Sequence, residues 1–123
     1  QYMNKKNFKF KSIKNNYYNN ISKYDLAIIS GGFIKFELMY LGIPTLFFTI
    51  EKHQTILSKL FSKNSMGKFI MEINIHNFEY QKALYCINNL IKSYNMRKKM
   101  FNYSRKKIDG NGLQNLINFF KKI

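Results

Sequence analysis

Three short apolar runs, each followed by a segment with helical periodicity, constrain the fold of this chain more than any other feature. They occupy residues 26–30 (LAIIS), 45–50 (TLFFTI) and 68–73 (KFIMEI). A strand covered by helices on both faces is apolar along most of its length, and strands that alternate with helices favour a parallel sheet. We therefore predict an α/β fold, a parallel sheet flanked by helices.

The segments around these runs complete the pattern. Residues 9–13 alternate weakly like a strand, Gly42 stands where a helix C-cap glycine belongs, and Pro44 prevents the preceding helix from continuing. The sequence Asp109-Gly110-Asn111-Gly112 is the strongest turn signal. Helical periodicity predicts helices over residues 19–24, 33–41, 53–64, 79–94, 96–108 and 113–120.

Length and composition indicate one globular domain over residues 1–123. The 46% hydrophobic content is enough for a core. No uncharged apolar run reaches the roughly 18 residues of a membrane span, and the polar, basic start has no signal-peptide core, so we expect a cytoplasmic protein. Cys86 is the one cysteine and suits a small core residue. We expect no metal site and no cofactor.

The formal net charge of +15 raises polyanions as partners. Only two of the 21 basic residues are arginines, which are the residues that contact bases and phosphates in bidentate fashion. We therefore expect no specific nucleic-acid partner. A non-catalytic basic module that binds nucleic acid or an anionic membrane surface stays open as an alternative, because the tail NLINFFKKI could lie on a bilayer.

Gly31 and Gly32 form a predicted turn between a buried strand and a helix. The carboxyl edge of an open α/β sheet is where ligands bind. Glycine lets a ligand approach the backbone, and the N-terminus of the next helix attracts an anion such as phosphate. An ordinary tight turn is the alternative.

Three polar residues lie near this turn in the predicted fold. Glu37 falls in the second turn of the helix among apolar residues, where a ribose diol could satisfy its carboxylate. His53 and Gln54 begin the next helix at the same edge, and an amide side chain suits sugar hydroxyls. Taken singly, each of the three also fits an exposed surface position.

These features occur together in one order. The stretch DLAIISGGFIKFELMYLGIPTLFFTIEKHQ resembles the nucleotide-sugar-binding segment of GT-B enzymes, most closely the C-terminal domain of family 28 glycosyltransferases and of the UDP-sugar hydrolase of pseudaminic acid and spore-coat polysaccharide synthesis. The ending KIDGNGLQNLINFF resembles the hydrolase branch. The matching positions are Asp25, Gly31, Gly32, Glu37, Leu41, Gly42, Pro44 and Gln54.

The resemblance implies a Rossmann-like sheet and a role for each matching residue. Gly31 and Gly32, with the amides of Phe33 and Ile34, would face the diphosphate. Glu37 would bind the ribose hydroxyls. Gln54, together with His53, would contact the sugar.

Two departures from the family pattern affect this site. Phe33, Ile34 and Lys35 replace small or hydroxylated residues, so a hydroxyl contact to phosphate is missing. We favour a solvated Lys35, with an electrostatic contact to phosphate as the alternative. Thr49 and Ile50 stand where a proline-containing loop is usual.

The resemblance also implies what this stretch lacks. We expect it to be the C-terminal portion of a GT-B C-terminal domain whose N-terminal, catalytic domain acts in cis or in trans. No catalytic residue is predicted, and His76 suits a surface position. The predicted ligand is a UDP-sugar, and the predicted activity of the whole enzyme is hydrolysis of a UDP-linked diacetamido-trideoxy sugar. A family 28 glycosyltransferase such as a UDP-GlcNAc transferase is the alternative.

Overall fold

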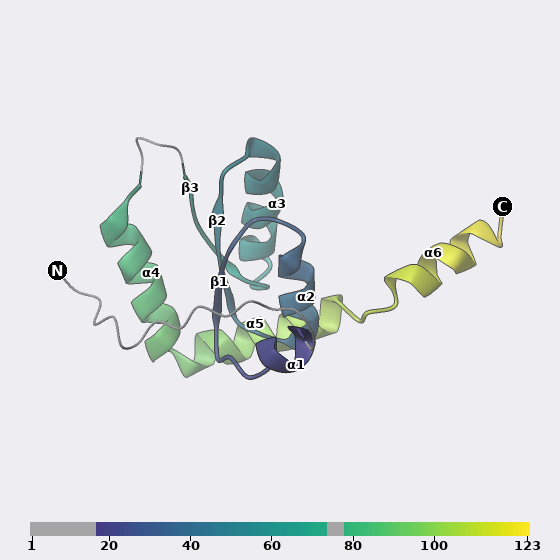
Figure 1. Ribbon diagram of the computed structural model, residues 1–123, viewed down its shortest axis with the longest axis horizontal. Helices are drawn as coiled ribbons and strands as arrows, with labels where there is room; N and C mark the ends of the chain where they lie inside the picture. Colours follow the sequence, from purple (N-terminus) through teal and green to yellow (C-terminus); the bar gives the residue numbers. More distant parts are fainter. Residues whose placement is uncertain (1–16, 74–77) are drawn as a thin grey trace.

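Three parallel strands form the centre of the molecule (Figure 1). The structure is a computed structural model that describes residues 17–73 and 78–123. Its strands, in the order β1-β2-β3 across the sheet, are β1 (Ala27–Ser30), β2 (Thr45–Thr49) and β3 (Lys68–Glu72). Both pairings are parallel. The parallel sheet is confirmed with these three strands, whereas the strand predicted over residues 9–13 lies outside the described residues.

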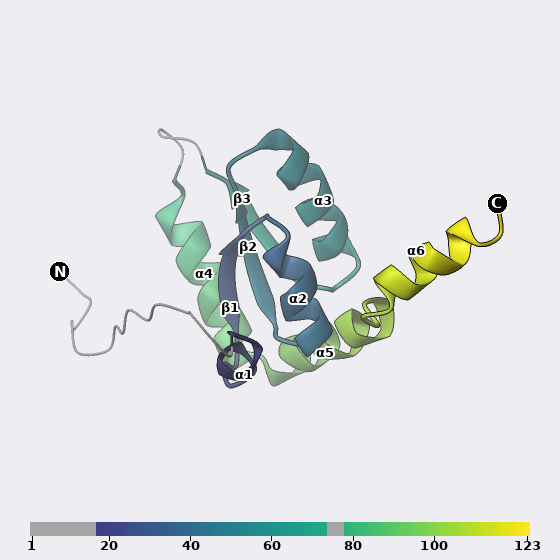
Figure 2. The ribbon, with the colours of Figure 1, turned by 45° about the vertical axis from the view of Figure 1, so that its right-hand side comes forward.

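Helices cover both faces of the sheet, which confirms the Rossmann-like arrangement. In Figures 1 and 2, α2 and α3 lie on one face, α4 lies on the other, and α5 runs across the end of the sheet where β1 begins. The helices are α1 (Tyr17–Ile21), α2 (Ile34–Leu41), α3 (Lys52–Lys63), α4 (Tyr80–Lys92), α5 (Tyr94–Lys107) and α6 (Gly112–Phe120).

The apolar character of β2 follows from this two-sided cover. Side chains alternate between the faces of a strand, and the neighbours Leu46 and Phe47 are both fully buried on opposite sides. Leu46 packs with Ala83 and Leu90 of α4, while Phe47 packs with Met39 of α2 and with α3. Two hydrophobic clusters, one on each face, therefore hold the sheet in place.

The end of α2 is set by Gly42, as predicted. Gly42 has φ 75°, a left-handed conformation that costs glycine little. Its amide donates to the Met39 carbonyl at 3.0 Å, and the amide of Ile43 donates to the Leu38 carbonyl at 2.8 Å. These two bonds satisfy carbonyls that the end of a helix leaves free. Pro44 can then follow directly and lead into β2.

The predicted boundary between the helices over residues 79–94 and 96–108 is wrong by a few residues. Ser93 has an extended backbone, and its hydroxyl accepts a hydrogen bond from the Met96 amide at 3.2 Å. Serine at an N-cap satisfies one of the free amides of a new helix. The chain therefore ends α4 at Lys92 and begins α5 at Tyr94.

The predicted turn at residues 109–112 is confirmed. The Asp109 carboxylate accepts hydrogen bonds from the backbone amide and the side-chain amide of Asn111, at 2.9 Å and 3.2 Å. These bonds hold the pKa of Asp109 below its usual value. The turn separates α5 from α6.

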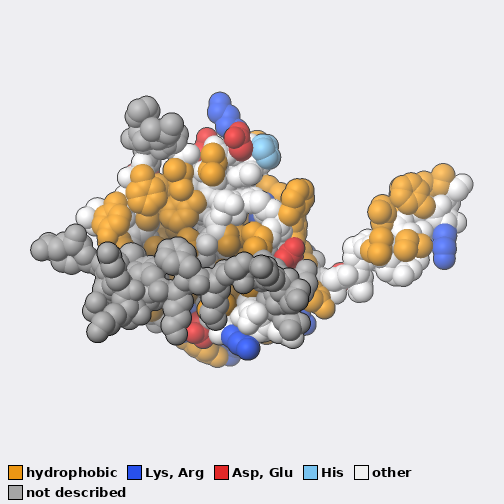
Figure 3. Space-filling view, viewed as in Figure 1, with side chains coloured by type: hydrophobic (Ala, Val, Ile, Leu, Met, Phe, Trp, Pro, Cys, Tyr) orange, Lys and Arg blue, Asp and Glu red, His pale blue; other side chains and the backbone are white. Residues whose placement is uncertain are grey.

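Helix α6 extends away from the sheet and buries no side chain (Figures 1 and 3). It exposes the apolar residues Leu113, Leu116, Ile117, Phe119, Phe120 and, just after it, Ile123. Whether the chain forms one domain therefore stays a prediction. Within the described residues, no helix has the length and apolarity needed to cross a membrane.

Candidate functional site

A small pocket lies at the carboxyl edge of the sheet, between the starts of α2 and α3. Strands β1 and β2 run parallel, so the residues that follow them meet at one edge. The volume of the pocket is about 150 Å³. Its lining consists of Gly31, Gly32, Phe33, Lys35, Phe36, His53, Gln54 and Leu57. The structure thus brings the predicted turn together with both residues that were predicted to contact sugar.

The close packing around Gly31 leaves no room for a side chain at this position. A Cβ atom on Gly31 would lie 2.6 Å from Cγ2 of Thr49 and 2.8 Å from Oγ of Ser58. Thr49 and Ser58 are both fully buried, so neither has room to move. Around Gly32 the nearest atom to a Cβ would be the Ser30 hydroxyl, at 3.9 Å. The two glycines therefore do different things, since Gly31 lets the turn pack against β2 and α3 while Gly32 leaves the pocket open.

The backbone beyond the glycines offers donors to a ligand. Among the described residues, the amides of Phe33 and Ile34 donate no hydrogen bond, and Phe33 provides no side-chain cap for α2. The next amides are already used, because Lys35 and Phe36 donate to the carbonyls of Gly32 and Phe33. Free amides at the start of a helix attract anions. The position suits the predicted contact with a phosphate.

Lys35 is buried, with 3% of its surface exposed, so the predicted solvated position is wrong. Its Nζ donates to the Gly31 carbonyl and lies 5.6 Å and 5.7 Å from the ring centroids of Phe36 and Phe61. Both distances are within the range of a cation–π contact. Desolvation by this burial lowers the pKa of Lys35 from its usual value. A positive charge therefore lines the pocket next to the turn.

Gln54 adds an acceptor without a donor. Its Oε1 is buried and has no hydrogen-bond partner within the part of the chain that the structure describes. A buried carbonyl oxygen in this state costs free energy, which a donor from a ligand would recover. His53 lines the same pocket with an exposed side chain. The two residues could contact the hydroxyl groups of a sugar.

Glu37 was predicted to share this site with the glycine turn and Gln54, but it does not line the pocket, so that placement is wrong. At 3.6 residues per turn, Glu37 lies on the side of α2 away from Lys35, and it is half-buried. In residues 17–73 and 78–123, the Glu37 carboxylate forms no hydrogen bond or ion pair. Its contact with ribose stays a prediction, and it requires the nucleoside to leave the pocket along α2.

A hydroxyl chain that sequence reasoning missed anchors the start of α3. The hydroxyl oxygens of Thr49 and Thr55 lie 2.5 Å apart, and Thr55 donates to Oε2 of Glu72 at 2.7 Å. Thr55 has one proton to donate, so Thr49 donates to Thr55. This chain links the ends of β2 and β3 to the helix that carries Gln54. Thr49, which departs from the family pattern, is part of it.

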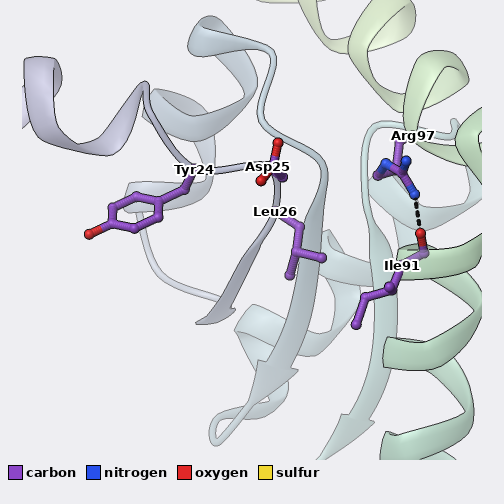
Figure 4. A pocket seen from close by; sticks show the side chains of 5 residues that line it. All are labelled: Tyr24, Asp25, Leu26, Ile91 and Arg97. Atoms are coloured by element: carbon purple, nitrogen blue, oxygen red, sulfur yellow. Dashed lines mark hydrogen bonds between the residues drawn. The ribbon is translucent and has the colours of Figure 1, made fainter. Parts of the chain in front are cut away.

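A larger pocket of about 470 Å³ lies at the opposite, amino edge of the sheet (Figure 4). Its charged members are Asp25, which is exposed, and Arg97. Nη1 of Arg97 donates to the carbonyl of Leu90 at 2.7 Å and to that of Ile91. These carbonyls belong to the last turn of α4, where cationic side chains are stabilising. The hydrogen bonds of Arg97 thus stabilise the end of α4. Asp25 matches a position of the resembled family but lies at this edge of the sheet, away from the glycine turn.

Metal-binding residues do not gather in the described part of the chain. No group of three or more histidine, cysteine, aspartate or glutamate side chains within residues 17–73 and 78–123 could hold a metal ion. Cys86 is half-buried and packs against the cluster beside α4, as a core residue does. His76 lies outside the described residues.

Comparisons with known proteins give one distant relationship. The chain is 26% identical over 90 residues to the spore coat polysaccharide biosynthesis protein SpsG of Bacillus subtilis (strain 168). The match covers 72% of this chain and 26% of SpsG, so the chain spans about a quarter of that relative's length. No family model and no solved structure matches. The similarity hints at a function related to polysaccharide biosynthesis.

Proposed function

We propose that this chain binds a UDP-sugar at the carboxyl-edge pocket. The observation that carries this proposal is the convergence, in one pocket, of a buried lysine with backbone amides and a buried amide oxygen that have no partner in the part of the chain that the structure describes. Amides and an ammonium group match the oxyanions of a diphosphate. The Gln54 oxygen matches a hydroxyl or amide donor on the sugar.

The pocket holds only part of such a ligand. Its volume of about 150 Å³ is below the roughly 300–1,000 Å³ of pockets that enclose drug-sized ligands. A phosphate with the adjoining edge of the sugar suits this size. The nucleoside would lie outside the pocket, toward Glu37, where the carboxylate could accept hydrogen bonds from the ribose hydroxyls.

The proposed role is that of the donor-binding part of a GT-B UDP-sugar hydrolase of surface-polysaccharide synthesis. The similarity to SpsG supports a place in polysaccharide biosynthesis. The turn Asp109-Gly110-Asn111-Gly112 in the ending that resembles the hydrolase branch favours the hydrolase over a family 28 glycosyltransferase. Binding that is equal in substrate and transition state does not accelerate a reaction. We therefore expect these 123 residues to bind UDP without turning over a UDP-sugar.

Titration calorimetry with UDP tests the proposal. Saturable binding by the wild-type chain is expected, with a weaker response to uridine, which lacks the diphosphate. Glu37→Gln should weaken UDP binding by about 1 to 3 kcal/mol through loss of charge-assisted hydrogen bonds, and should affect deoxy-UDP less. Absence of saturable UDP heat from folded protein would contradict the proposed function.

A second candidate, binding to an anionic membrane surface, is favoured by α6. The helical period gathers the five large apolar side chains of α6 on one side, and these five and Ile123 are all exposed. Lys121 and Lys122 end this segment, and Arg105, Lys106 and Lys107 precede it. An apolar face with cationic neighbours suits anionic lipid. The same charges oppose contact between two copies of the chain.

Vesicle co-sedimentation separates the second candidate from the first. Binding to phosphatidylglycerol vesicles, weaker in high salt and weaker for phosphatidylcholine, is expected if α6 docks on anionic lipid. Phe120→Gln should reduce the bound fraction, whereas Asn118→Gln on the polar side should not. Equal sedimentation with both lipids, or a stable dimer in ultracentrifugation, would count against membrane docking.

A further inference from the structure

The one buried lysine among the described residues carries a charge that those residues do not compensate. Lys35 is 3% exposed. An ammonium group has three N–H donors, and the Gly31 carbonyl is the one acceptor that Nζ reaches within residues 17–73 and 78–123. The single ion pair found there joins Lys82 to Glu79. Lys35 therefore has spare donors and no carboxylate.

Such a group is costly unless something pairs with it. A buried charge without a counter-ion is strongly disfavoured, and proteins normally supply one. The rings of Phe36 and Phe61 attract the ammonium, but a ring quadrupole does not neutralise it. Since Lys35 lines the pocket, a ligand that enters can supply the missing negative charge.

We propose that Lys35 is the charge partner of a phosphate group bound in the carboxyl-edge pocket, and that the Gly31 carbonyl holds its ammonium in place for that contact. This inference rests on the proposed function and names the group that confers preference for an anionic ligand. The phosphate would accept from Lys35 and from the free amides of Phe33 and Ile34. Gln54 would accept from a neighbouring hydroxyl of the same ligand.

A packing role and a phosphate-binding role of Lys35 predict different effects of its replacement on stability and on UDP affinity. If Lys35 serves packing alone, its replacement should weaken the fold and leave UDP affinity unchanged in the folded fraction. If Lys35 serves a phosphate, Lys35→Met should hold or increase the stability of the free protein, because it removes an uncompensated buried charge from an apolar site. The same variant should lose affinity for UDP.

Titration calorimetry on the full 123-residue chain, with UDP, uridine and inorganic pyrophosphate as probes, tests this inference. Lys35→Met should weaken UDP and pyrophosphate binding by about tenfold or more and change uridine binding little. Lys35→Arg keeps the charge and should retain more UDP affinity than Lys35→Met. Lys59→Met is the matched control, because Lys59 is exposed and its Nζ lies 5.7 Å from the centroid of the Phe69 ring.

The outcomes distinguish the two proposals. If the wild-type chain binds no UDP, the proposed function fails and the role of Lys35 fails with it. If the wild type binds UDP and Lys35→Met matches Lys59→Met, the proposed function stands and the role of Lys35 is rejected. If Lys35→Met does not fold, Lys35→Gln replaces it, and UDP affinity equal to that of the wild type would equally reject the role.

Discussion

The two edges of the sheet carry pockets of opposite character. The amino-edge pocket is about three times larger in volume, at about 470 Å³ against about 150 Å³. Its arginine already donates to two carbonyls of α4, and its carboxylate on Asp25 is exposed. Among the described residues, the carboxyl-edge pocket has a lysine without a counter-ion, a buried amide oxygen without a donor and free backbone amides.

This difference is the reason for proposing the carboxyl-edge pocket, and not the larger one, as the ligand site. Folded chains satisfy nearly all their buried polar groups, so groups that stay unsatisfied in one place call for an explanation. At the amino edge, the hydrogen bonds of Arg97 to the carbonyls of α4 stabilise the fold. At the carboxyl edge, buried groups such as Oε1 of Gln54 have no partner among the described residues, and the proposed ligand would supply one. Unmet hydrogen-bonding capacity, more than volume, is therefore our reason for proposing the site at the carboxyl edge.

The largest expected effect on stability is that of Gly31→Ala. The added Cβ meets Thr49 and Ser58, both fully buried, and overpacking of this kind costs about 1–3 kcal/mol. The free energy of unfolding in urea measures the loss. Gly32→Ala is the control, because its Cβ would make only an ordinary contact, 3.9 Å from the Ser30 hydroxyl, and it should change stability by less than about 0.5 kcal/mol. Equal effects of the two variants would show that the close approach at Gly31 does not constrain the turn.

The next largest effect tests the amino edge. Arg97→Met removes both hydrogen bonds to the last turn of α4 and should lower the free energy of unfolding by about 1–3 kcal/mol. It should leave UDP affinity unchanged. Lys98→Met, a change of an exposed neighbour, should change neither the free energy of unfolding nor the affinity for UDP. Loss of UDP binding in folded Arg97→Met would reverse the comparison and place the ligand at the amino edge.

The sequence predicts the features of this fold that depend on local residues, and it misses those that depend on contacts between distant segments. The strands, most of the helices and the C-cap at Gly42 were predictable, because apolar runs, helical period and glycine act locally. The grouping of the Gly31-Gly32 turn with Gln54 was predictable, because parallel strands bring their carboxyl ends to one edge.

What could not be predicted depends on partners far away in the chain. The burial of Lys35 requires Phe61, which comes from α3. Its long apolar stem equally suits a solvated lysine, so local pattern gave the wrong interpretation. The bond between Thr55 and Glu72 joins residues 17 apart in sequence. Arg97 reaches back to Leu90 across a helix boundary that Ser93 sets.

A smaller effect should follow from breaking the hydroxyl chain. Thr55→Val keeps the shape and removes the donor to Glu72, and should cost about 1–2 kcal/mol in the free energy of unfolding. Because Thr55 anchors the start of α3, UDP affinity should also fall modestly through displacement of Gln54. Ser62→Ala, a change of a half-buried hydroxyl on α3 away from the pocket, is the control. A Thr55→Val chain with unchanged stability would show that the hydroxyl chain does not anchor the helix.

The smallest expected effect is a change of stability with pH. Burial lowers the pKa of Lys35 in the folded protein, whereas the unfolded chain titrates near the ordinary lysine value of about 10.4. Between those two pKa values the unfolded state binds more protons than the folded state, so stability rises with pH in that window. Below the folded pKa both states are protonated, and the full cost of the buried charge is present.

Lys35→Met has no such cost. Its advantage in the free energy of unfolding over the wild type should therefore be constant at low pH and should shrink as pH rises toward the ordinary lysine range. Urea unfolding of both chains at a series of pH values measures this difference. His53 is the other titratable side chain that lines the pocket, and the same comparison between wild type and Lys35→Met in a His53→Gln background removes its contribution.

Saturating UDP should abolish the pH dependence below the ordinary lysine range, because a phosphate that pairs with the ammonium keeps Lys35 charged. A difference that grows with pH, or one that UDP leaves unchanged, would contradict the pairing.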